Sequence, residues 1–90
     1  MENKTIVLKN GQKESYFSLI ALCFESKAAQ GVTIGQMREN FKMIDLFETD
    51  QDFIELTPAQ LKTVKDALDS MVWGVMDKQI IEMQDYINEL

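Results

Sequence analysis

The chain has 90 residues, of which 46% are hydrophobic and 27% are charged, and its formal net charge is −6. This length predicts a single domain spanning residues 1–90 with a thin core, and the apolar fraction excludes a disordered chain. The acidic balance disfavours nucleic-acid binding, which needs clustered Lys and Arg to replace the counterions of the phosphate backbone.

The charge is unevenly distributed along the chain. Residues 1–42 carry six basic and four acidic side chains, whereas residues 43–90 carry three basic and eleven acidic ones. We interpret the second half as a solvated acidic surface that keeps the protein soluble.

The sequence also restricts the compartment. No segment approaches the roughly 20 apolar residues needed to cross a bilayer, and Met1–Lys4 begin no secretory signal. The single cysteine, Cys23, can form no intrachain disulfide and suits a reducing compartment. We therefore expect a cytoplasmic protein that makes no membrane contact.

The first predicted elements are a short strand and a long buried helix. Thr5–Leu8 is apolar and β-branched and runs into a turn at Asn10-Gly11, which predicts a strand. Ser15 can cap the first helix, which should end near residues 28–30 with Gly31 as the breaker. Its apolar stripe has helical spacing and comprises Tyr16, Leu19, Ile20, Cys23 and Phe24.

The second helix has a strong start signal. Thr33 and Gln36 form a capping box, in which each side chain binds the other residue's backbone N–H. The helix should run to about Glu48. Its predicted inner face comprises Ile34, Met37, Phe41, Ile44 and Phe47.

A second strand and a third helix are predicted next. Phe53–Leu56 is short and partly apolar and is the expected partner of the first strand. Thr57 and Gln60 form another capping box, with Pro58 at the first helical position, where a missing N–H costs nothing. The apolar face of this helix comprises Leu61, Val64, Leu68 and Met71.

The last predicted helix follows a break at Gly74 and begins at an Asp77 cap. The complete pattern predicts an α+β fold that is mainly α. Four helices pack with a minimal two-stranded sheet in the order β-α-α-β-α-α, and the sheet depends on the helices because a two-stranded ribbon is marginal alone.

Catalytic and metal-binding motifs are missing from the sequence. There is no histidine, which removes Ser-His-Asp and Cys-His catalysis and His-containing zinc sites. Cys23 lies on an apolar stripe, where an inert thiol is expected, and no glycine-rich phosphate loop is present. The acidic residues 45–55 lack the spacing of a calcium loop. We therefore expect no enzyme activity, no cofactor and no metal site.

The end of the chain carries the features that suggest binding. Six methionines is a high number, and methionine adapts to irregular binding surfaces as well as to cores. Trp73 can anchor an interface. The apolar residues of the last helix, which follow Trp73, have heptad spacing. This spacing suits either packing inside the domain or docking on a partner. The candidate partner-binding residues are Trp73, Met76, Ile80, Met83, Ile87 and Leu90.

Four segments of the chain resemble small accessory proteins of uncharacterised function encoded by tailed bacteriophages and prophages. They are Gly31–Arg38, Ile44–Glu48, Ile54–Thr57 and Met71–Asp77, and the resemblance extends over nearly the whole chain. Its motifs are caps, turns and core positions. The resemblance implies a phage origin, with a role in virion assembly or on a host protein, in the host cytoplasm or associated with the virion.

Three functional hypotheses follow. The first is a phage-type accessory protein that binds a host or phage protein, or forms a homodimer through the last helix. The second is a winged-helix-like DNA-binding regulator, in which residues 33–40 would begin the recognition helix. That helix has only two basic side chains, Arg38 and Lys42, with which to contact DNA. The third is an acidic decoy of a nucleic-acid-binding protein.

Overall fold

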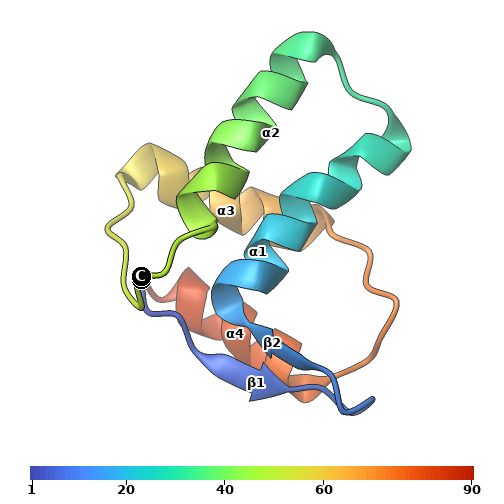
Figure 1. The fold of residues 1–90 in the computed structure, drawn as a ribbon, viewed down its shortest axis with the longest axis vertical. Coiled ribbons are helices and arrows are strands. Elements are labelled where there is room, and N and C mark those ends of the chain that lie inside the picture. The colour runs from blue at the N-terminus through green and yellow to red at the C-terminus, as the bar shows by residue number, and fades with distance from the viewer.

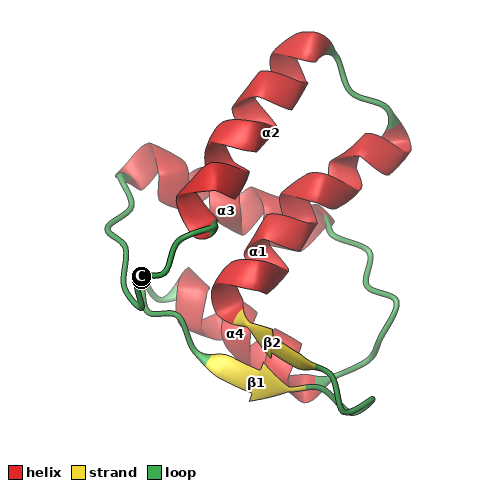
Figure 2. Cartoon of the chain, viewed as in Figure 1, coloured by secondary structure: helices red, strands yellow, loops and turns green.

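The computed structural model describes all residues 1–90 and contains four α-helices and one two-stranded antiparallel sheet (Figures 1 and 2). The predicted fold class, α+β and mainly α, is confirmed. The elements are β1 (Thr5–Val7), β2 (Lys13–Ser15), α1 (Tyr16–Glu25), a 3-10 helix (Ser26–Gln30), α2 (Ile34–Phe47), α3 (Pro58–Ser70) and α4 (Lys78–Asn88).

The sheet is a hairpin, so the order of elements differs from the predicted one. β1 pairs with β2, with Val7 opposite Lys13, and the turn places Gly11 at a φ of 84°. A positive φ of this size favours glycine, and it allows the chain to reverse within a few residues. The polar composition of Lys13–Ser15 concealed this strand in the sequence.

The segment predicted as the second strand has a smaller role. Within residues 53–56, only Phe53 forms a β-bridge, and its partner is Glu2 rather than a residue of β1. The neighbouring Ile54 donates its backbone N–H to the carbonyl of Met1 at 3.1 Å. The segment thus lies beside the chain that leads into β1 and extends no regular sheet.

The caps predicted from the sequence are all present. Ser15, Thr33 and Thr57 each accept the backbone N–H of the residue three positions later, and Asp77 accepts that of Gln79. These bonds satisfy donors that a helix start leaves unpaired, so the helices begin where the cap residues stand. The first α-helix ends at Glu25, earlier than predicted, and the 3-10 helix continues to Gln30.

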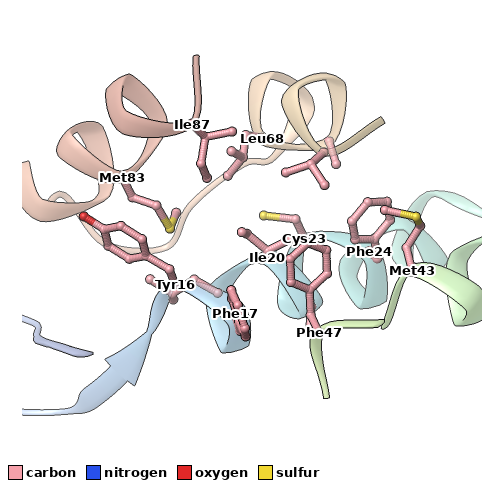
Figure 3. Packing of buried hydrophobic residues seen from close by; sticks show 14 of the residues in the cluster. Tyr16, Phe17, Ile20, Cys23, Phe24, Met43, Phe47, Leu68, Met83 and Ile87 are labelled. Atoms are coloured by element: carbon pink, nitrogen blue, oxygen red, sulfur yellow. The ribbon is translucent and has the colours of Figure 1, made fainter. Parts of the chain in front are cut away.

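The core is built around α1, and seven of its ten residues are buried. Figure 3 shows these side chains between those of α3 and α4 on one side and those of α2 on the other. The rings of Phe17 and Phe47 meet edge to face, with their centroids 5.4 Å apart. The buried side chains from the other helices include Met43, Ile44, Val64, Leu68, Met83 and Ile87.

The predicted inner face of α2 is correct only for its last two residues. Ile44 and Phe47 are buried, whereas Ile34 and Phe41 are 68% and 60% exposed and Met37 is also exposed. The N-terminal end of α2 lies with the 3-10 helix at the end of the molecule remote from the sheet and α4 (Figure 1). No other element covers its outer side.

None of the helices is both long enough and apolar enough to cross a bilayer.

Truncation of Ile20, which is fully buried in α1, tests this core. Ile20→Ala should lower the free energy of unfolding by about 2–5 kcal/mol, and Ile20→Val by about 0.5–1.5 kcal/mol, because each leaves unfilled space. The control is Leu22→Ala in the same helix, where the side chain is 42% exposed and we expect a loss of about 1 kcal/mol or less. Urea unfolding followed by circular dichroism measures these values. If Ile20→Ala and Leu22→Ala lowered the free energy of unfolding equally, the burial of Ile20 in the core would be contradicted.

Candidate functional site

The structure separates the six predicted partner-binding residues into two groups. Ile80, Met83 and Ile87 are buried within the domain's own core, so the heptad spacing of α4 reflects intramolecular packing. Trp73 is half-buried, whereas Met76 is 91% exposed and Leu90 is also exposed. Trp73 and Met76 lie together on a groove, whose base also includes the mostly buried Ile80, and Leu90 does not line it.

This groove, which we call the Trp73 groove, has a volume of about 420 Å³. It lies between the loop that joins α3 to α4, the start of α4 and the turn that follows β1. Its apolar lining comprises Trp73, Val75, Met76, Ile80 and Ile81. Ile81 is exposed and was not among the predicted candidates. The groove can therefore accept an apolar side chain from outside the domain.

Asp77 holds the walls of the groove together. One of its carboxylate oxygens accepts the backbone N–H of Gln79, and the other accepts that of Lys9, each at 2.9 Å. The side-chain amide of Gln79 donates to the carbonyl of Val7 at 2.6 Å. These bonds tie the hairpin to the first turn of α4. The two backbone N–H groups, that of Gln79 first, hold the pKa of Asp77 below its ordinary value because they stabilise the carboxylate.

The groove carries a net positive charge, from two lysines and the Asp77 carboxylate, in a chain that is acidic overall. Lys9 and Lys78 both line it, and both are exposed. The structure contains two ion pairs, Lys42 with Glu39 and Lys62 with Asp66, so neither groove lysine is paired. An apolar groove with two free ammonium groups is suited to an apolar side chain that has a carboxylate beside it.

A second apolar surface, which we call the α2 face, consists of Ile34, Met37 and Phe41. Met37 and Phe41 also border a hollow of about 220 Å³ between α1 and α2. The sequence contained a signal for this surface. At 3.6 residues per turn, Phe41 points about 160° away from Met43, so one helix face cannot bury both.

Cys23 is buried in the core, as its position on the apolar stripe predicted. Burial raises the pKa of its thiol to about 12, despite a smaller opposing effect of Lys27. The reactive thiolate is therefore scarce at neutral pH. No three His, Cys, Asp or Glu side chains are grouped so that they could hold a metal ion.

Comparison with known proteins returned no match: no family model, no curated protein and no solved structure is similar to this chain.

The thiol of Cys23 provides a prediction about reactivity. Ellman's reagent at pH 8 should react with the native protein at least about 100-fold more slowly than with the urea-unfolded protein, because burial both shields the sulfur and disfavours the thiolate. The absorbance of the released thionitrobenzoate measures both rates. Comparable rates in the two states would contradict the burial of Cys23.

Asp77 provides a prediction about pH. Its pKa is lower in the folded chain than its ordinary 3.8, so its contribution to stability is present above pH 3.8 and is lost as the pH falls through the folded value. Asp77→Ala should therefore unfold at a lower temperature than the wild type at neutral pH. This difference should narrow below pH 3.8. Thermal unfolding at a series of pH values measures it, and a difference that stays constant down to pH 2 would contradict the role of the carboxylate.

Proposed function

We propose that this chain is a non-enzymatic accessory protein of phage or prophage type that binds another protein through the Trp73 groove. The observation that carries the proposal is an exposed apolar groove with an aromatic anchor and two unpaired lysines. Aromatic side chains in partly enclosed pockets often dominate the energy of protein interfaces. Met76 adds a flexible apolar side chain that adapts to the shape of its ligand.

The chemistry of the groove specifies the partner. Trp73, Met76 and Ile81 offer apolar contacts, and Lys9 and Lys78 offer charge-assisted hydrogen bonds at its border. We expect the partner to present a large apolar side chain within a few residues of Asp or Glu. The ammonium groups also attract such a segment, so its association should slow as the salt concentration rises.

The phage assignment is supported by the sequence segments that resemble phage and prophage proteins. One of them, Met71–Asp77, includes the loop that forms a wall of the groove and the aspartate that ties it to the hairpin. About half of the groove lining thus comes from residues that carry the resemblance. We propose action in the host cytoplasm or in association with the virion, on a host or phage protein.

The two alternative hypotheses receive less support. In a DNA-binding regulator, α2 would supply Arg38 and Lys42, but Lys42 is engaged with Glu39 at 3.1 Å and the α2 face around them is apolar. Two basic side chains can make only a few contacts with the phosphate backbone of DNA. A decoy of a nucleic-acid-binding protein needs dense negative charge, whereas the Trp73 groove is bordered by two lysines.

A displayed random-peptide library, selected on the immobilised protein, tests the groove. The selected peptides should contain a large apolar residue next to an acidic one. Met76→Ala should weaken their binding about fivefold or more, because it removes an interface side chain, and Lys78→Glu should do the same by repelling the acidic residue. Isothermal titration calorimetry with a selected peptide measures the affinities.

The matched control is Val72→Ala, because Val72 is 82% exposed in the same loop but does not line the groove. This variant should bind the peptide as the wild type does. Peptides without an acidic preference, or equal losses for Val72→Ala and Met76→Ala, would contradict the proposed binding site.

A further inference from the structure

The α2 face exposes more apolar surface than a helix end in water normally retains. Ile34 and Phe41 lie two turns apart on the outer side of α2, and Met37 lies beside them. The adjoining hollow is bordered by further apolar side chains, including Phe24, Val32 and Ile44. A continuous apolar strip beside an unfilled hollow is typical of a surface that another helix covers.

Two charged side chains flank this strip and specify which helix could cover it. Arg38 and Asp45 are exposed and take part in neither of the two ion pairs of the chain. They are seven residues apart, about two turns or 10 Å along α2, and therefore project from the same side of the helix. The midpoint between them falls beside Phe41.

We propose that a second copy of this chain docks on the α2 face, with the two α2 helices antiparallel about a twofold axis next to Phe41. Reversing one helix about this point places each Arg38 opposite the partner's Asp45, so the same ion pair forms twice. It also places the partner's Phe41 opposite the hollow beside Met37 and Ile44. A twofold interface requires such self-complementarity, in which each residue meets its counterpart reciprocally.

The geometry of antiparallel helices supports the arrangement. Residues on one flank of the first helix face residues on the same flank of the second. Taking 100° per residue, Arg38 and Asp45 lie within about 20° of each other around α2, and Phe41 and Met37 lie on the opposite flank of the strip. The ion pairs and the apolar contacts therefore occupy different sides of one seam and do not compete for space.

The available area predicts a weak dimer. A standard interface buries about 800 Å² on each partner, which is roughly 13% of the 6039 Å² surface of this chain. A pair of helices of 14 residues each, about 21 Å long, lies at the small end of this range. We expect a dissociation constant in the micromolar range, at the weak end of what interfaces of standard size give.

This dimer is independent of the Trp73 groove. The N-terminal half of α2 lies at one end of the molecule, whereas the hairpin and the start of α4 lie at the other (Figure 1). The inference therefore goes beyond the proposed function, and the failure of either leaves the other standing.

Reciprocal charge reversal tests the dimer. Arg38→Asp alone sets two aspartates against each other at each end of the seam, and Asp45→Arg alone sets two arginines against each other. Each single variant should weaken dimerisation about tenfold or more. The double variant Arg38→Asp/Asp45→Arg keeps the net charge and should restore the wild-type affinity to within about threefold. Sedimentation equilibrium over a concentration series that reaches the millimolar range measures the dissociation constants.

Two further variants complete the experiment. Phe41→Ala should abolish the dimer, and circular dichroism should show that it folds, because its side chain is exposed. Asp85→Arg makes the same charge change as Asp45→Arg on an exposed site of α4 and should dimerise as the wild type does. A wild-type chain that stays monomeric throughout would overturn the proposal. If the double variant dimerises no more tightly than the single variants, the antiparallel pairing is overturned.

Discussion

The burial of α1 is the constraint on which the rest of the structure depends. With seven of its ten residues buried, this helix must be covered from several sides, and α2, α3 and α4 all contribute side chains to it. Ser15 ends β2 and also caps α1, so no loop separates the hairpin from the helix. Asn3 and Lys4 accept the backbone N–H groups of Phe17 and Tyr16, which ties the strand before the turn to the same helix start. The hydrogen bonds of Asp77 and Gln79 hold the hairpin beside α4, and the Trp73 groove forms where the two meet.

The parts of the fold that could be predicted are those that depend on local chemistry. A cap residue acts on an N–H two or three positions away, so each helix start was visible in the sequence. Strand pairing depends on contacts across the fold, and the polar strand Lys13–Ser15 carries no apolar pattern. The turn at Gly11 signalled a hairpin, but the more apolar segment at residues 53–56 was the more conspicuous partner. In α2, the five apolar residues assigned to one face span about 140° around the helix, and the fold buries only the flank that holds Ile44 and Phe47, together with Met43.

The candidate site was predictable to a similar extent. Trp73 and Met76 stood out because a tryptophan and a methionine flank the helix break at Gly74. The contribution of Lys9 could not be predicted, because it reaches the groove through a hydrogen bond from its backbone to Asp77, 68 positions along the chain. Ile80, Met83 and Ile87 have the spacing of an interface helix, but the same spacing serves a helix packed inside a domain. These side chains join α1 in the core of the folded domain, and this packing shows that α4 is an internal helix rather than an interface helix.

The positions of the two apolar surfaces have a consequence for binding strength. A domain of 90 residues offers little area for any one interface, so contact at the Trp73 groove alone should be weak. A dimer formed through α2 would carry two such grooves at its outer ends, away from the seam. If the partner is itself repetitive, as the subunits of an assembly are, the second groove would bind at a high effective concentration once the first is occupied. Two modest surfaces at opposite ends of a small domain can therefore produce tight binding to a repeated partner, while contact with a single copy of that partner remains brief.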